Sequence, residues 1–259
     1  MAFNDAEIAF VTDGYGTITI GSAGAPISGI DNVTPTAYEE AEAGLTTGLD
    51  DVNGADGDYG IRYTLADVGG SGLTFDGFYT TEHGSGDANA DNAGSGQAAF
   101  NKGAGWEIVV KGDVAGVDGL AIGVGYANLE TEDTATTTVK SGAIDQDEGT
   151  AYLTYAYGPV KVGYQKSAVS IGSTNTLHKT DYYSISYTAT DNLSLSYSKV
   201  EAQKTAADGL QSNQDMDGLS LAYTMGGMTI SIADNDCSNC SYSAGRSQDY
   251  QTMSLSVAF

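Results

Sequence analysis

Seven carboxylates lie between residues 22 and 57, and no lysine or arginine accompanies them. Carboxylates gathered on one segment create a negative potential, which attracts cations and repels anions within a Debye length, ~8 Å at physiological salt. The segment has no strand or helix periodicity, and connections of this length are usually functional or disordered. It is therefore either a cation-attracting functional loop or a solvated acidic surface loop. Its acids are Asp31, Glu39, Glu40, Glu42, Asp50, Asp51 and Asp56.

Cys237 and Cys240 are the only cysteines, and they lie in a predicted loop. In an oxidising compartment this short spacing most simply gives a local disulfide. A thioredoxin-like redox role needs a strand-to-helix setting, which the sequence does not offer. Zinc needs two more soft ligands, and the two histidines, His83 and His178, are predicted in loops far away in the chain. The pair is therefore predicted to be a disulfide.

Two acidic runs, residues 53–58 and 87–92, place oxygen ligands at alternate positions, which suits Ca²⁺. The second run departs from an EF-hand, because it lacks a glycine at its sixth position and has Ala98 where the bidentate glutamate would stand. Weak calcium binding in loops and unliganded acidic loops both stay open, and no firm metal site or other cofactor is predicted. The candidate ligands are Asp56, Asp58, Asp87 and Asp91.

The composition excludes several classes of function. A formal net charge of −24 argues against binding to nucleic acid through a basic surface. The sequence contains no Gly-x-Ser-x-Gly elbow and no His-Glu-x-x-His motif, so no enzymatic activity is predicted. It contains no apolar run of transmembrane-helix length, although a membrane-spanning β-strand needs only about 9–11 alternating residues.

Period-two alternation predicts thirteen β-strands along the chain. The last strand is the clearest, because Met253, Leu255, Val257 and Phe259 alternate with small or polar residues up to the end of the given sequence. One face of the predicted strands is Leu, Ile, Val, Phe and Tyr. The other is small or polar and carries Arg62, Asp76, Glu107, Lys111 and Lys161. Such a polar face is typical of the wet interior of a large barrel.

The connections between the predicted strands alternate between long and short. Long polar loops are predicted at residues 22–57, 82–104, 130–146, 168–178, 202–214 and 235–247, and short turns separate them. An up-and-down barrel with long loops at one end and short turns at the other requires this order. The sequence therefore predicts one unit over residues 1–259, an all-β antiparallel transmembrane barrel.

The chain resembles the general diffusion porins of Gram-negative outer membranes, and most of all their alphaproteobacterial branch. The resemblance rests on the hairpin 6–22, the aperiodic segment directly after it, Ile232–Asp236 in the penultimate strand, and the terminal Phe259. It implies a water-filled channel in the cell outer membrane, surrounded by lipid and assembled as a homotrimer, for small hydrophilic solutes and cations. It also implies sixteen strands, so we expect that a signal peptide and three strands are missing from this sequence.

The resemblance further implies that residues 22–57 fold into the barrel and constrict it. Acids of the segment would then face basic residues on the barrel wall, and Arg62 is the nearest of these in sequence. The expected constriction consists of Glu39, Glu40, Glu42, Asp50, Asp51 and Arg62, and the expected pore wall includes Asp76, Lys111 and Lys161. The alternative is a secreted or surface-attached acidic β-rich protein with a structural or adhesive role.

Overall fold

The computed structural model describes residues 6–55, 59–81, 104–130, 145–172 and 174–258 of the 259-residue chain. Thirteen strands form one antiparallel sheet in which each strand pairs with its neighbours in sequence, so the predicted strand count and fold class are confirmed. The strands are β1 (Glu7–Thr12), β2 (Gly16–Gly21), β3 (Gly60–Leu65), β4 (Leu73–Thr80), β5 (Gly105–Asp113), β6 (Leu120–Leu129), β7 (Gln146–Tyr157), β8 (Val160–Ile171), β9 (Thr176–Thr190), β10 (Leu193–Thr205), β11 (Gln211–Met225), β12 (Met228–Ser238) and β13 (Ser247–Val257).

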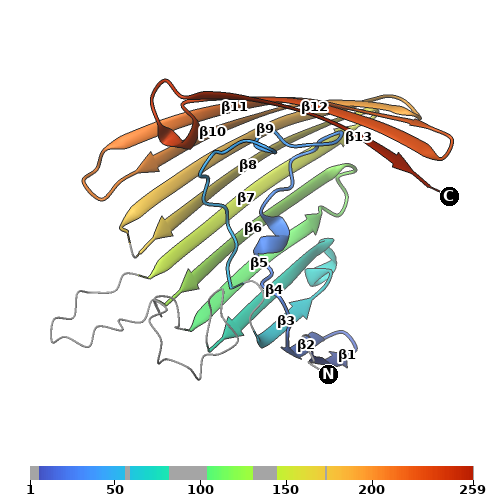
Figure 1. Ribbon diagram of the computed structural model, residues 1–259. Helices are drawn as coiled ribbons and strands as arrows, with labels where there is room; N and C mark the ends of the chain where they lie inside the picture. Colours follow the sequence, from blue (N-terminus) through green and yellow to red (C-terminus); the bar gives the residue numbers. More distant parts are fainter. Residues whose placement is uncertain (1–5, 56–58, 82–103, 131–144, 173, 259) are drawn as a thin grey trace, which may run out of the picture.

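The sheet is strongly curved, and its first and last strands lie at opposite ends of it (Figure 1). Within the described residues, β1 pairs with β2 and β13 pairs with β12, so the sheet is open between its two edge strands. Because every pairing is antiparallel and the strand number is odd, β1 and β13 run in the same direction. No helix in the described ranges is long and apolar enough to cross a membrane.

The two faces of the sheet differ as the alternation predicts. Ile108 and Ile185 are each 45% exposed and Ile122 is half-buried, and all three belong to the apolar face, which we call the outer face. Met253, Leu255 and Val257 of β13 lie on the same face and are also exposed. The opposite, inner face carries Ser, Thr, Gly and a few charged or amide side chains, among them Glu107 and Gln165, which are buried.

Residues 22–55, which we call the inner-face loop, account for the burial of this polar face. Figure 1 shows the segment in blue, crossing in front of the sheet from the β4–β6 region toward β12 and β13. Its only regular structure is a single 3-10 turn, η1 (Ser28–Ile30). Apolar residues of the loop pack on the sheet in three clusters, one of which joins Ile27, Ile30 and Val52 to Val109 of β5.

Three of the predicted long loops are in the predicted places, but their predicted bounds are too wide. They are residues 168–178, 202–214 and 235–247, whose connections in the structure are only residues 172–175, 206–210 and 239–246. The polar composition of these stretches predicts loops, but a β-ladder is held by backbone groups and needs no apolar side chains. The strands therefore continue beyond their apolar part. One consequence is that His178 lies within β9 and is 1% exposed, although a loop position is predicted for it.

The short turns lie where they are predicted, between β3 and β4, β5 and β6, β7 and β8, β9 and β10, and β11 and β12. Four of them contain glycine in the left-handed region, as at Gly158 with φ of 56° and Gly226 with φ of 62°. Most of the predicted loops 82–104 and 130–146 lie outside the described residues.

Candidate functional site

The inner-face loop is closed on itself at its base by a buried carboxylate of β5. Glu107 accepts hydrogen bonds from the backbone N–H of Ile27, at 3.1 Å, and from that of Ala55, at 2.6 Å. Its side chain is 1% exposed, so these donors replace the water that a carboxylate loses on burial. One residue of the sheet thus joins the beginning and the end of the loop.

A second carboxylate, Glu148 of β7, repeats this arrangement beside the first. It accepts hydrogen bonds from the N–H groups of Asn53, at 2.8 Å, and Gly54, at 2.7 Å. Gln146 donates to its other oxygen at 2.6 Å. The returning arm of the loop is therefore bound through its backbone to two neighbouring parts of the inner face.

Amide and hydroxyl side chains hold the middle of the loop in the same way. Gln165 of β8 accepts from the N–H of Val33 at 3.1 Å and donates to the carbonyl of Ile30 at 2.9 Å. Ser220 of β11 accepts from the N–H of Glu39 at 3.2 Å and donates to its carbonyl at 2.7 Å. Ser196 of β10 and Asn235 of β12 add further bonds to loop backbone groups.

Glycines of the inner face let the loop approach the sheet closely. A Cβ atom on Gly218 of β11 would lie 2.7 Å from the Cα of Ala41. One on Gly125 of β6 would lie 2.9 Å from side-chain atoms of Ile27 and Ile30. Any larger residue at these two positions would displace either the loop or its side chains.

Within the loop, the carboxylates come together rather than spreading along it. The Asn32 side-chain amide donates to Glu40 at 2.5 Å and to Glu42 at 2.7 Å. Asp31 accepts from the N–H of Val52 at 3.0 Å, and Tyr182 of β9 donates its hydroxyl to Asp51 at 3.1 Å. Four acids of the loop thus share one partly buried, hydrogen-bonded region on the inner face.

Burial is the main cause of the altered pKa values of these acids. It raises the pKa of Asp31 to about 7, and the nearby charge of Asp51 adds to the effect. Burial, together with the neighbouring Glu42, raises the pKa of Glu40 to about 8. The pKa values of Glu42 and Asp51 are also raised, again mainly by burial. The charge of the loop therefore varies with pH near neutrality.

The arrangement expected for Arg62 differs in the structure. Its guanidinium lies 2.9 Å from Asp76 of the adjacent strand and donates to the carbonyl of Ala23 at 3.3 Å. Thr64 also donates to Asp76, at 2.6 Å. Arg62 therefore pairs with an acid of the inner face and binds the backbone of the loop, rather than a loop carboxylate. The reason is the β3–β4 register, which places Arg62 opposite Phe78 and next to Asp76 on the same face.

The other predicted pore residues are placed as follows. Lys111 of β5 reaches the loop, and its Nζ lies 3.2 Å from the position that a Cβ on Gly29 would take. Lys161 of β8 is on the inner face and exposed. Asp50 lies 2.9 Å from Nε2 of His178, and Glu39 is held through its backbone. The structure thus brings together three of the predicted constriction acids, Glu40, Glu42 and Asp51, while Arg62 pairs with Asp76 instead.

Cys237 and Cys240 are joined by a disulfide. The candidate calcium ligands Asp56, Asp58, Asp87 and Asp91 lie outside the described residues, as does His83. In the ranges that the structure describes, no group of three or more His, Cys, Asp or Glu residues could hold a metal ion.

The residues that hold the loop in place are not among the predicted site residues. Glu107, Glu148, Gln165 and Asn235 stand on strand faces where most neighbouring positions are small or polar residues. A long acid or amide on such a face needs partners when it is buried, and this is the signal that the sequence contains for them. Their partners are backbone groups, which have no sequence signature.

No protein-family model and no curated protein matches this chain by sequence. Solved structures do match it. An anion-selective porin from Comamonas acidovorans matches with a TM-score of 0.63 and 14% identity over 98% of this chain and 77% of its own. This chain has the porin fold. This chain is also similar to Salmonella typhi OmpF in complex with daunomycin, with a TM-score of 0.61 and 12% identity over 97% of this chain and 77% of the OmpF chain. An in-vitro folded trimer form of OmpT, an outer membrane protein of Vibrio cholerae, matches with a TM-score of 0.53 and 14% identity over 96% of this chain and 77% of its own.

Proposed function

We propose that this protein forms a water-filled channel in the outer membrane, through which small hydrophilic solutes and ions diffuse passively and cations pass preferentially. The observation that supports this most directly is the inner-face loop, an acidic segment held by hydrogen bonds across the polar face of a porin-fold sheet. In this proposal residues 22–57 constrict the channel of a single barrel unit over residues 1–259.

The outer face supports a membrane location. Its Leu, Ile, Val and Tyr side chains are exposed on strand after strand, including Ile108, Leu153 and Ile185. Apolar surface on this scale is costly in water and is matched by lipid hydrocarbon or by a neighbouring protomer. The same observation weighs against the secreted acidic alternative, which would expose this surface to water.

The proposal also covers the oligomeric state, the surrounding lipid and the preferred ions. We propose a homotrimer surrounded by outer-membrane lipid, because one solved structure with this fold is a trimer form. Cation preference follows from charge, because the loop contains seven acids and no base. A fold shared with an anion-selective porin does not oppose this preference, since selectivity depends on the charges around the channel. We propose no enzymatic activity and no resident cofactor, and calcium binding by the acidic loops stays a prediction.

The test is the reversal potential of the protein in a planar bilayer under a salt gradient. At a pH above the raised pKa of Glu40, replacing Glu39, Glu40 and Glu42 with glutamine should shift the reversal potential toward anions, and more at low salt than at high salt. The matched control replaces three acids of the outer face, Asp234, Asp236 and Asp249, with asparagine, and should leave the preference unchanged. An unchanged preference in the glutamine variant at low salt would show that the loop is not the constriction.

A further inference from the structure

The turn between β12 and β13 is closed by the Cys237–Cys240 disulfide and has an unusual backbone. Asn239, Ser241 and Tyr242 all have positive φ, between 55° and 59°. Residues other than glycine rarely adopt this region, which is disfavoured by about 1–2 kcal/mol per residue. Such a conformation persists only where the surroundings fix it. Here the disulfide does so, together with the bond from the N–H of Gly245 to the Asn239 side chain, at 2.9 Å.

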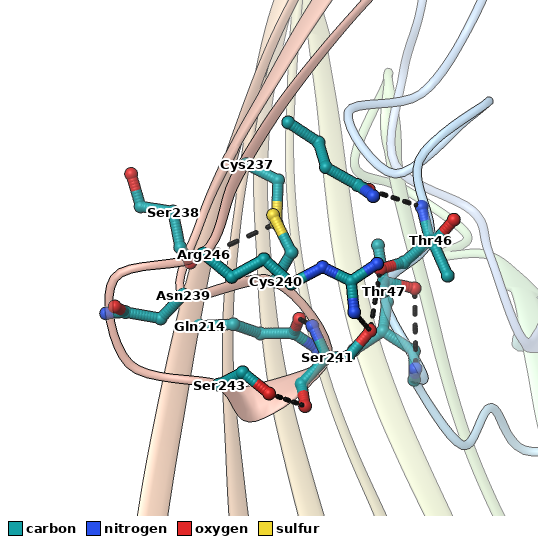
Figure 2. Close-up of a disulfide and its surroundings, with 12 residues drawn as sticks. Thr46, Thr47, Gln214, Cys237, Ser238, Asn239, Cys240, Ser241, Ser243 and Arg246 are labelled. Atoms are coloured by element: carbon teal, nitrogen blue, oxygen red, sulfur yellow. Dashed lines mark hydrogen bonds between the residues drawn. A yellow bond between two sulfur atoms is a disulfide. The ribbon is translucent and has the colours of Figure 1, made fainter.

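This backbone directs Ser241 toward the inner-face loop (Figure 2). The Ser241 hydroxyl donates to the carbonyl of Thr46 at 2.9 Å. Its N–H donates to the side chain of Gln214 of β11, also at 2.9 Å, which fixes the turn to the sheet. The N–H of Thr46 in turn donates to Gln248 of β13 at 2.8 Å. Both backbone groups of Thr46 are therefore bound by residues on or beside the disulfide-closed turn.

Tyr242 reaches the next part of the loop indirectly, through His178 of β9. Its ring meets that of His178 edge-on, with 5.5 Å between the ring centroids. Nε2 of His178 lies 2.9 Å from Asp50. Gly44 packs on the ring of Tyr250 in β13, because a Cβ at that glycine would overlap the ring. Residues 44–50 are thus held by β13, by His178 and by the turn.

This attachment differs from the rest of the loop. Elsewhere the loop is bound by residues within strands, such as Glu107 and Gln165, which the ladder fixes. At Thr46 one of the two partners belongs to a turn whose conformation depends on a bond that can be reduced.

We propose that the disulfide-closed turn, residues 237–246, is a clamp that fixes residues 44–50 of the inner-face loop, and that reduction of the disulfide releases them. A dithiol supplies the electrons: its two thiols become a disulfide, while the Cys237–Cys240 bond takes up two electrons and two protons and becomes two thiols. The consequence for conduction rests on the proposed function: in the channel, the clamp limits the motion of residues 44–50 and so keeps the size of the constriction constant.

Hydrogen exchange tests the clamp without any reference to conduction. After treatment with dithiothreitol, amides of residues 44–50 should exchange about two- to tenfold faster, as expected when one or two hydrogen bonds are lost. Residues 27–33, which strands β5 and β8 hold, should be unchanged. If both cysteines are shown to be alkylated and exchange at 44–50 is unaltered, the clamp is wrong.

Single-channel recording tests the effect of the clamp on the proposed channel. The reduced protein, and the Cys237→Ser/Cys240→Ser variant without reductant, should show more frequent brief current steps than the oxidised protein. Ser241→Ala should reproduce part of this with the disulfide intact. Ser243→Ala is the control, because it removes a hydroxyl that bonds only inside the turn, and it should not increase the number of brief current steps. Equal current fluctuations before and after reduction would overturn the proposed effect. If the protein never conducts, the proposed channel function is refuted. The hydrogen-exchange experiment would still show whether the clamp exists.

Discussion

Glu107 and Glu148 show how a carboxylate can be a structural residue on the polar face of a sheet. Each is buried, and each accepts two backbone N–H groups from the inner-face loop. A buried carboxylate is costly unless such donors replace its water, and once they do, the same groups hold the loop strongly. Glu107 uses one oxygen for each N–H group, and a glutamine, which has a single acceptor oxygen, cannot reproduce this pair.

Replacing Glu107 with glutamine should therefore loosen the base of the loop. Glutamine keeps one acceptor but turns an N–H₂ group toward a backbone donor, so we expect a loss of about 1–3 kcal/mol in the free energy of unfolding. Denaturant unfolding in detergent measures this, and faster hydrogen exchange at Ala55 should accompany it. Glu201→Gln is the control. Glu201 is exposed and pairs with Lys199, so the change should be within about 1 kcal/mol. Equal losses in both variants would contradict the role of Glu107.

The carboxylates of the loop should make ion preference depend on pH. Asp31 and Glu40 have pKa values of about 7 and about 8, so both lose their protons as pH rises through this range. The loop becomes more negative, and the reversal potential should move toward cations between about pH 6 and pH 9. Glu40→Gln should make this pH dependence shallower, because the group with the higher value no longer titrates. A reversal potential that is constant over this range would contradict the prediction.

At the scale of elements, the loop and the sheet fit because small residues stand where they meet. Gly218→Ala should displace the loop, since the new Cβ would lie 2.7 Å from a backbone atom of Ala41. We expect a destabilisation of about 1–3 kcal/mol, typical of overpacking, and faster exchange in residues 39–43. Gly149→Ala is the control within a strand, because the nearest atoms to its Cβ would lie 3.8 and 4.0 Å away. Thermal unfolding of the two variants compares them, and similar melting temperatures would show that the contact is not tight.

The strands were predictable because apolar and polar residues alternate along them, and this alternation reflects the different environments of the two faces of the sheet. The ends of the strands were not predictable. Thr176–Asp181 and Gln211–Asp217 each contain a single apolar residue, Leu177 and Met216, and only the pairing with a neighbouring strand shows that they continue the ladder. The segment 22–57 was identified by its length and its acids, but its position depends on Glu107, Glu148 and Gln165. These contacts join residues far apart in sequence through the loop's backbone, which no pattern of side chains reveals.

The whole molecule is organised by its two faces, and tyrosines mark the edge of the apolar one. Tyr126 and Tyr164 donate their hydroxyls to Asp147 and Asp181, which lie on the adjacent strand. In both pairs the aspartate is two residues from the tyrosine's direct partner in the ladder. The ring thus belongs to the apolar belt and its hydroxyl to the polar zone beyond it, as is typical of a membrane interface.

A charge should accordingly be tolerated on one face and not on the other. Ile185→Lys places a cation in the middle of the outer face, where we expect a cost of about 2–4 kcal/mol in a bilayer. Ser194→Lys, on the inner face of β10, should cost little, because water can reach that face. Folding yield into lipid vesicles at increasing urea measures both. If Ser194→Lys is the more harmful change, the assignment of the faces is inverted.

The loop is attached almost entirely through its own peptide groups. Glu107, Glu148, Gln165, Ser220 and Asn235 each bind N–H or C=O groups, which every residue except proline provides in full. The sheet therefore specifies the path of the loop mainly through backbone groups and through a few buried apolar residues, and it leaves side chains such as that of Glu39 unspecified. The sequence of such a segment can be changed by design. Charged, aromatic or metal-binding side chains can replace the native side chain at positions such as Glu39 while the backbone path stays the same. In the proposed channel, the residues that select solutes would thus differ from the residues that stabilise the loop, which would make the protein a scaffold for designed permeability.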